Sequence, residues 1–277
     1  MTGLVLTLRE PPSQRVDMSA LTPRALAGRA PKDVAALTLP CGNRSLRVDE
    51  LFQVSGTMVL PREEGRIAIR KATSRLDRIG FGMTHGTVIV EGDSGAYAGM
   101  GMTGGSLRIS GSVGPFAACV MAGGELRIGG DAGEFLGAAV PGERIGMHGG
   151  VVSVAGNAAA RAGDELRRGT LLIGGNAGPY CGARMIAGTI LVLGEIGDFL
   201  GLGMKRGTIL LARKPKRLLA TFNDCGSHHL QFLPLMFEAA RDAGPAFARL
   251  KKFGNRVRRF AGDRGAGGQG EILIRES

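Results

Sequence analysis

Residues 85–103 read HGTVIVEGDSGAYAGMGMT, and this 19-residue pattern recurs along the middle of the chain. Later units open at Gly104-Gly105, Gly123-Gly124, Gly149-Gly150, Arg168-Gly169, Ala187-Gly188 and Arg206-Gly207. The third unit carries a seven-residue insertion around residues 141–147, and a weaker copy runs from Gly65 to Met83. A fixed period of this size predicts a stacked solenoid, because one coil is too small to bury its own apolar face.

Each unit contains one short run in which apolar residues alternate with other residues. The alternating pairs are Val88/Val90, Leu107/Ile109, Leu126/Ile128, Val152/Val154, Leu171/Ile173, Ile190/Val192 and Ile209/Leu211. Such alternation is typical of a strand, and the glycines leave no room for a helix-length apolar stripe. Gly-Asp-x-Gly or Gly-Asn-x-Gly often follows and suits a corner with positive φ. The sequence therefore predicts an all-β fold, a single-stranded right-handed parallel β-helix with 19-residue coils.

Stacking such coils brings equivalent side chains into columns. One column consists of Met83, Met102, Met121, Met147, Leu166, Met185 and Met204. We interpret it as a thioether ladder in the core and not as a copper site, because methionine fills irregular corners well. A second column, predicted to be an aromatic stack, contains Tyr97, Phe116, Phe135, Arg161, Tyr180 and Phe199. A third contains Asp93, Ser112, Asp131, Asn157, Asn176 and Glu195. Corner geometry explains this third column better than calcium, since calcium-binding β-helices have a shorter repeat.

The chain divides into three predicted regions. They are residues 1–60, an N-terminal cap region; residues 61–212, the β-helix; and residues 213–277, a basic C-terminal helix and tail. Residues 4–8 alternate like a strand, and residues 22–28 resemble a short capped helix. A small α/β cap is expected over the first coil, because the open end of a solenoid exposes strand edges.

Near the other end, Ser227 is predicted to begin a helical region that stops at Gly244-Pro245. In the last coils the outward-facing strand residues are Leu172, Leu191 and Leu210. A soluble monomer seldom exposes such an apolar stripe. We expect the C-terminal helix, another subunit, or both to cover it.

Composition indicates what forms the core and which kinds of segment and site the chain lacks. The 277 residues include 47 glycines and no tryptophan, so aliphatic ladders must form the core. The sequence has no membrane-length apolar run, and its first ten residues lack the features of a signal peptide. Its cysteines, Cys41, Cys119, Cys181 and Cys225, lie far apart. They predict buried thiols in a reducing cytoplasm and no zinc or iron–sulfur site.

Positive charge is concentrated near the C-terminus. Residues 205–264 contain 14 Lys and Arg against four acids, a net charge of +10, while the whole chain carries +11. Such a field attracts an anionic partner, either nucleic acid, an acidic protein surface or a polyanionic cofactor, unless it is simply a solvated basic cap. Nucleic acid is the weakest candidate, because few aromatic residues accompany the basic ones and no known module is present.

No catalytic constellation emerges from the histidines, which are His85, His148, His228 and His229. They show neither metal-ligand spacing nor the pattern of a nucleophilic triad. The hexapeptide-repeat acyltransferases use coils of 18 residues, which disagrees with the period of 19. We therefore expect no catalytic and no metal-binding residue in this chain.

The G-x-x-M-x-x-G and G-[DN]-x-G pattern over residues 65–212 resembles a known β-helical domain. It is shared by the C subunit of formylmethanofuran dehydrogenase and the C-terminal domain of the glutamate synthase large subunit. The tail is similar to the ending of these C subunits, through residues 260–264, FAGDR, and residues 267–273, GGQGEIL.

This resemblance implies a non-catalytic scaffold in a formyltransferase/hydrolase complex. Such a complex transfers a formyl group from tetrahydromethanopterin to a methanofuran-type carrier and hydrolyses it to formate. The expected partners are the amidohydrolase-like A subunit, the B subunit and the formyltransferase-like D subunit. Two alternatives remain: the C subunit of a redox-active molybdenum or tungsten formylmethanofuran dehydrogenase, and a free-standing structural β-helix that binds an acidic partner.

The resemblance also suggests a role for the basic end, because carriers of this type bear glutamate-rich tails. No cofactor is expected to bind catalytically to this chain, while a methanofuran-type carrier with a polyglutamyl tail is expected in the complex. The residues hypothesised to hold an acidic subunit or the carrier tail are Arg213, Lys214, Lys216, Arg217, Lys251, Lys252, Arg256, Arg258 and Arg259.

Overall fold

The computed structural model describes residues 3–57 and 65–276. The first group of elements is β1 (Leu4–Leu8), β2 (Val16–Asp17), α1 (Pro23–Leu26), α2 (Pro31–Ala35), β3 (Thr38–Cys41), β4 (Arg44–Arg47), α3 (Val48–Leu51) and β5 (Phe52–Ser55). The middle group is β6 (Arg66–Ala72), β7 (Leu76–Asp77), β8 (Thr87–Gly92), β9 (Thr103–Ile109), β10 (Ala122–Ile128), β11 (His148–Val154), β12 (Arg168–Ile173), β13 (Thr189–Val192) and β14 (Thr208–Leu211). The last group is β15 (Asn223–His229), α4 (Leu233–Arg241), the 3-10 helix η2 (Pro245–Lys252), β16 (Arg256–Gly262), the 3-10 helix η3 (Arg264–Ala266) and β17 (Gly270–Arg275).

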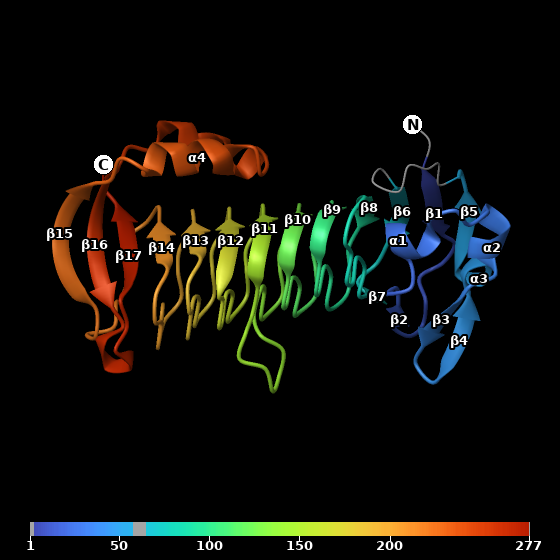
Figure 1. Cartoon of the computed structure of the whole chain (residues 1–277), viewed down its shortest axis with the longest axis horizontal. Coiled ribbons are helices and arrows are strands. Elements are labelled where there is room, and N and C mark those ends of the chain that lie inside the picture. The colour runs from blue at the N-terminus through green and yellow to red at the C-terminus, as the bar shows by residue number, and fades with distance from the viewer. Residues whose placement is uncertain (1–2, 58–64, 277) are drawn as a thin grey trace.

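One long sheet dominates the protein. Within the described residues it has thirteen strands in the order β15-β16-β17-β14-β13-β12-β11-β10-β9-β8-β6-β1-β5 (Figure 1). Every pairing from β1 through β14 to β17 is parallel. Antiparallel strands close both ends, β5 against β1 and β15–β16 against β17. The protein is therefore mostly β, with a long parallel sheet consistent with the predicted β-helix.

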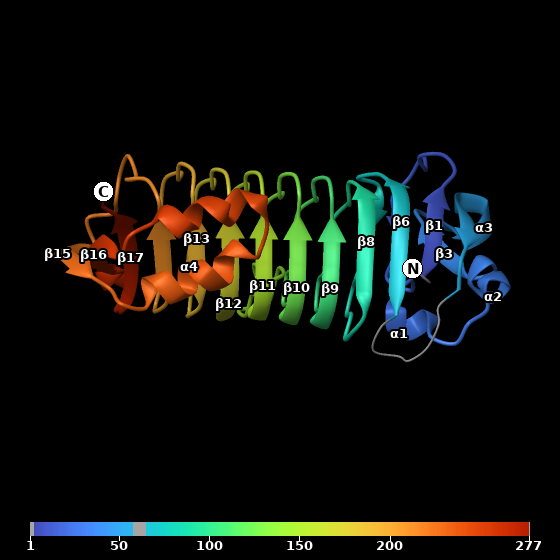
Figure 2. The ribbon, with the colours of Figure 1, turned by 90° about the horizontal axis from the view of Figure 1, so that it is seen from above.

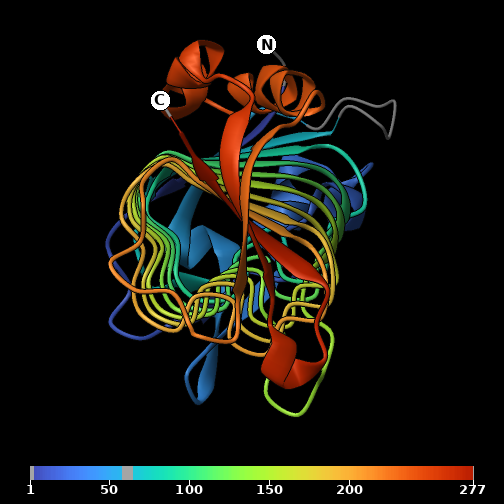
Figure 3. The same ribbon diagram turned by 90° about the vertical axis from the view of Figure 1, so that its left-hand side faces the viewer.

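The repeated units keep the same register from strand to strand. Leu107 pairs with Leu126, Leu171 with Ile190, and Ile190 in turn with Ile209. Seen end-on, the units superimpose (Figure 3). The predicted insertion lies between β10 and β11 and projects as a loop away from the sheet (Figure 1).

The columns predicted from the sequence are confirmed. In the first column, the six methionines and Leu166 are at most 1% exposed. Tyr97, Phe116 and Phe135 stack with ring centroids 5.2 and 4.8 Å apart, and Tyr180 stacks on Phe199 at 4.8 Å. Arg161 fills the gap, with its guanidinium carbon 5.7 Å from the Phe135 ring and 4.7 Å from the Tyr180 ring. The stack is thus continued by cation–π contacts.

Close packing at the corners requires glycine in places. Gly105 has a φ of 80°, and a Cβ atom there would lie 2.5 Å from Met83 Cε and 2.7 Å from the Gly86 carbonyl oxygen. A larger residue would therefore displace both the backbone and the methionine ladder.

At the N-terminal end, β1 forms as predicted and adds a parallel strand to the same sheet. The short helix α1 also forms, and Thr22 caps it by accepting a hydrogen bond from the backbone N–H of Ala25 at 3.3 Å. The predicted boundary between residues 60 and 61 lies outside the described residues.

The C-terminal helices form a cover, which we define as α4 and η2. It lies over β11 to β14 (Figure 2) and buries Leu172, Leu191 and Leu210. From the cover, Leu233, Phe237 and Phe247 pack against these leucines. The expectation that the C-terminal helix covers the apolar stripe is thereby confirmed.

Two expectations at this end are wrong. Ser227 does not begin a helix but lies in β15, which becomes a strand because it pairs with β16. Cys225 on this edge strand is exposed, whereas Cys41, Cys119 and Cys181 are buried as predicted.

Candidate functional site

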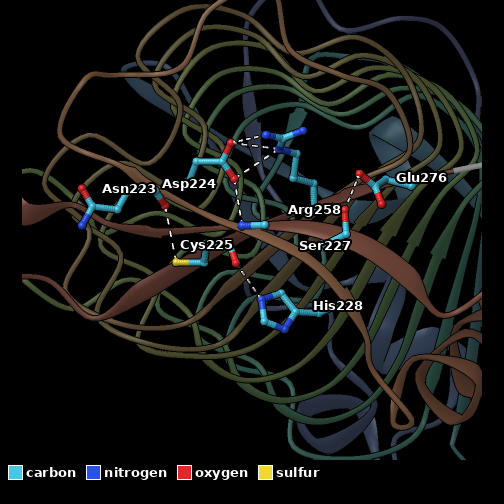
Figure 4. Close-up of polar contacts among 8 residues, drawn as sticks. Asn223, Asp224, Cys225, Ser227, His228, Arg258 and Glu276 are labelled. Atoms are coloured by element: carbon cyan, nitrogen blue, oxygen red, sulfur yellow. Dashed lines mark hydrogen bonds and ion pairs between the residues drawn. The ribbon is translucent and has the colours of Figure 1, made fainter.

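The strand β16 positions three of the predicted basic residues, and each meets an acid. The Arg258 guanidinium donates to Asp224 on β15, with Nη2 2.5 Å and Nε 2.9 Å from Oδ2 (Figure 4). Hydrogen bonding from Arg258 and from the Gly226 N–H holds the pKa of Asp224 below its usual value, and the same pair raises the pKa of Arg258. Both side chains remain substantially exposed, so this pair contributes little to stability.

The neighbouring arginines are paired in the same way. Arg256 Nε lies 3.1 Å from Glu276 Oε2, and Arg259 Nε lies 2.9 Å from Glu271 Oε2. Glu271 also accepts from the Thr208 hydroxyl at 2.8 Å, which ties β17 to the last repeated unit. These three arginines therefore already have partners within the chain.

Two of the nine predicted residues meet in one hollow. Lys214 and Arg258 line a depression of about 370 Å³ together with Asp224, Phe260 and Glu276. Elsewhere Arg213 Nη1 lies 3.9 Å from Glu195 Oε1.

Three more predicted residues are exposed, Lys216 and Arg217 in the connection from β14 to β15 and Lys252 at the end of η2. The side chain of Lys251 lies outside the described part of the chain. The predicted patch is therefore spread over three segments.

Figure 4 shows the polar contacts along β15. The Ser227 hydroxyl donates to Glu276 Oε1 at 3.0 Å, and His228 Nε2 lies 3.0 Å from the Cys225 carbonyl oxygen. The Cys225 thiol lies 3.6 Å from the Asn223 carbonyl oxygen. The contact of Ser227 joins β15 to the residue that follows β17, while the contacts of Cys225 and His228 lie within β15 itself.

The described residues show neither a cluster of metal ligands nor an activated thiol. No group of three or more His, Cys, Asp or Glu side chains there is placed to hold a metal ion. Burial raises the pKa of both Cys119 and Cys181 to about 12, so neither thiol is a ready nucleophile. Of the helices described, none has the length and apolar character needed to cross a membrane.

Sequence reasoning missed a larger basic hollow, which we name the corner groove. It measures about 800 Å³ and lies where β11, β12, β13 and β14 begin. Its lining comprises Val120, Glu143, Ile145, His148, Arg167, Arg168, Ile186, Ala187, Lys205 and Arg206. A signal was available, since the basic residues directly follow the core column at Leu166 and Met204.

Together, these observations define a mostly β protein whose long parallel sheet is consistent with a β-helix and which carries charged hollows on its surface. No family model matches the sequence. A chain of the crystal structure of the formyltransferase/hydrolase complex (FhcABCD) from Methylorubrum extorquens, in complex with methylofuran, matches with a TM-score of 0.88. The two are 36% identical, and the match covers 99% of this chain and 100% of that chain.

Curated relatives give the same result over shorter stretches. The C subunit of the formyltransferase/hydrolase complex Fhc from Methylorubrum extorquens is 37% identical over 90 residues, 32% of each chain. The C subunit of the tungsten-containing formylmethanofuran dehydrogenase 2 from Methanococcus maripaludis is 30% identical over 97 residues, 35% of each chain. These alignments span about a third of each relative. The chain belongs to the family formed by the C subunits of formylmethanofuran dehydrogenases and formyltransferase/hydrolase complexes.

Proposed function

We propose that this chain is the non-catalytic scaffold, the C subunit, of a formyltransferase/hydrolase complex. The full-length likeness to a chain of the FhcABCD structure is the observation that carries this proposal. The complex would transfer formyl from tetrahydromethanopterin to a methanofuran-type carrier and hydrolyse it to formate. The chemistry would take place on the amidohydrolase-like and formyltransferase-like partner subunits.

The proposal includes the finer description of the fold. We infer a single-stranded right-handed β-helix with 19-residue coils over the described part of residues 61–212, which begins at residue 65, between a cap region and a basic tail. The constant interval between paired residues in β12, β13 and β14 supports the coil length. The hand is supported by the strong preference of parallel crossover connections for right-handedness.

We also propose that the assembly works in the cytoplasm, where thiols stay reduced. All four cysteines of the chain are free, which suits that compartment. No catalytic cofactor is assigned to this chain, and the methanofuran-type carrier belongs to the assembled complex.

Purification of the affinity-tagged chain from its source, followed by native mass spectrometry, tests the proposal. We expect the A, B and D subunits to co-purify in defined stoichiometry. Recovery of the chain alone, or only as copies of itself, would instead support a free-standing structural β-helix.

The tungsten enzyme relative keeps a second candidate open, the C subunit of a formylmethanofuran dehydrogenase. Metal analysis of the same purified complex separates the two candidates. Stoichiometric molybdenum or tungsten indicates the dehydrogenase, whereas formyl transfer without either metal indicates the transferase/hydrolase.

We further propose that the basic end helps to hold an acidic carrier tail or an acidic subunit. The residues best suited are Lys214, Lys216, Arg217 and Lys252, since no ion pair with an acid is found for them within the described chain. Each exposed contact would contribute about 0.2–1 kcal/mol, so several must act together.

Replacing Lys214, Lys216 and Arg217 by glutamine should lower the carrier content of the purified complex several-fold. The effect should shrink as salt is raised, because salt screens exposed charges. Glutamine at Arg24, Arg29 and Arg44 provides a control of equal charge change. Unchanged carrier content and unchanged assembly in the first variant would rule the hypothesis out.

A further inference from the structure

The corner groove is built by the repeat itself. We call each repeated unit, with its strand, a rung. His148 of β11 pairs in register with Arg168 of β12, so these two side chains lie on adjacent rungs. Ile186 and Ala187 occupy the corresponding corner of the next rung, and Lys205 and Arg206 that of the rung after it. The groove therefore presents a basic rung, an apolar rung and a second basic rung in succession.

The cations of the groove have exposed side chains. Across residues 3–57 and 65–276, no ion pair joins Arg167, Arg168, Lys205 or Arg206 to a carboxylate. Lys205 Nζ donates to the Ala266 carbonyl oxygen at 2.5 Å, which leaves its charge uncompensated.

At another corner of the same coils, two arginines have acidic partners. Arg161 and Arg184 both donate to Asp164, at 3.0 Å and 2.7 Å from Oδ2, and its side chain is only 2% exposed. In the corner groove, by contrast, the four positive charges have no such carboxylate among the described residues. Like charges gathered in one hollow repel one another, so a bound anion would stabilise them.

Rung spacing determines which anion fits. Adjacent strands lie about 4.8 Å apart, so the two basic rungs are separated by about 10 Å. An extended peptide advances about 3.3 Å per residue, and its alternate side chains point to the same side. Carboxylates four residues apart, about 13 Å along an extended chain, can therefore reach both basic rungs while the side chain midway between them faces the apolar rung.

We propose that the corner groove docks an extended acidic segment of a partner subunit, in which two carboxylates flank an apolar side chain. This inference rests on the proposed function, because it assumes an assembly of several subunits. Ile186 and, from the insertion, Ile145 line the groove and would contact the apolar side chain, and the basic rungs would bind the carboxylates.

A uniformly anionic polymer fits this groove less well. It would gain nothing from Ile145 and Ile186, and it would face Glu143, which lines the same hollow. A protein segment that combines acidic and apolar residues satisfies both halves of the lining.

Site-directed photocrosslinking in the intact complex tests the proposal. Benzoylphenylalanine in place of Ile186 should crosslink to one peptide of a co-purified partner subunit. That peptide should contain at least two Asp or Glu residues within about five positions of the crosslinked residue. A crosslink to the carrier alone, to a peptide without acids, or to nothing while the partners still co-purify overturns the inference.

Charge reversal provides the matched measurement. The variant Arg167→Glu with Arg206→Glu should weaken association with the partner subunits on the order of tenfold. Arg24→Glu with Arg44→Glu changes the net charge equally on exposed residues of the N-terminal region and should change association less than about twofold. Equal effects of the two variants, with both still folded, contradict docking in the groove. If the unsubstituted chain recovers no partner subunits, the proposed function itself fails, and this inference with it.

Discussion

At the scale of single residues, the corners of the ladder are held by polar side chains that bond from one rung to the next. Asp131 Oδ1 accepts from the backbone N–H of Asn157 at 2.6 Å and from its side-chain amide at 3.1 Å. Asn157 in turn accepts from the N–H of Asn176 at 2.8 Å, and Asn176 from that of Glu195 at 2.8 Å. The column predicted to serve corner geometry therefore satisfies backbone donors that a turn leaves free.

We predict that Asp131→Ala lowers the free energy of unfolding by about 1 kcal/mol, because the bonded N–H of Asn157 loses its acceptor. Asp131→Asn should restore most of the loss, since an amide oxygen fills this role at Asn157 and Asn176. Urea denaturation measures the effect. Asp198→Ala is the control, an exposed acid for which the described chain shows no side-chain partner. If Asp131→Ala and Asp198→Ala cost the same, the ladder contributes nothing specific.

Asp263 has a comparable task where the tail meets the last coil. It is 4% exposed, and its carboxylate accepts from the N–H groups of Gly203 and Gly265, both at 2.9 Å. Burial alone raises the pKa of this carboxyl, but the hydrogen bonds that it accepts, that from the Gly203 N–H foremost, together outweigh burial and bring the pKa below its usual value. The folded protein therefore favours the ionised form.

From the sign of this shift, Asp263 stabilises the fold above the pKa of the unfolded chain, near 4, and less as the pH falls through the lower folded value. We predict that Asp263→Asn costs about 1–3 kcal/mol at pH 7 and that the difference from the unsubstituted protein narrows at pH 3. Urea denaturation at both pH values measures it, with Asp198→Asn as the control. A difference that stays constant or widens in acid would contradict this assignment.

At the scale of elements, the cover and the sheet depend on each other. Besides the apolar contacts, the Ser153 hydroxyl donates to the Ala243 carbonyl at 3.1 Å, and Arg249 Nη2 donates to the Gly174 carbonyl at 3.1 Å. The cover is held by an apolar core of its own, separate from the core inside the coils. It can therefore loosen while the ladder remains folded.

Phe247 is 1% exposed in the core beneath the cover, so Phe247→Ala should cost about 3–5 kcal/mol. Hydrogen exchange should rise mainly in α4 and η2 and stay slow in β8 to β10. The control Phe232→Ala removes a ring that is 47% exposed and should change stability by no more than about 0.5 kcal/mol. Uniform loss of protection across the sheet would show that cover and ladder unfold as one unit.

The strands of the repeat could be predicted from the sequence, because each repeated unit shows the same alternation of apolar residues. The strand β15 could not, since residues 223–229 carry no apolar alternation and are extended only through pairing with β16. The candidate site was harder still. Adjacent basic residues in the sequence, such as Arg258 and Arg259, turn out to be paired with acids from β15 and β17. The corner groove instead gathers residues from different coils.

At the scale of the whole molecule, the parallel ladder lies between two antiparallel ends. β5 closes one end and the β15–β16 pair closes the other, which leaves few parallel edges open to further growth. Between these ends each coil contacts chiefly its neighbours, so stability should be roughly a sum of coil and interface contributions. The fold should therefore tolerate the loss of a whole coil. It should not tolerate the loss of part of a coil, which would shift the residue columns out of register.

This reasoning yields a prediction for deletions away from the cover. Removal of residues 104–122 takes out one whole coil and joins Thr103 to Gly123, so that β8 would meet β10 in the register it now has with β9. We expect a soluble, cooperatively unfolding protein with a lower Tm, because one interface is lost. Removal of residues 104–115 takes out fewer residues but breaks the phase of the methionine and aromatic columns, and it should prevent folding. Circular dichroism and thermal unfolding of the two proteins compare them directly. Equal tolerance of both deletions would mean that the 19-residue coil is not the unit from which the molecule is built.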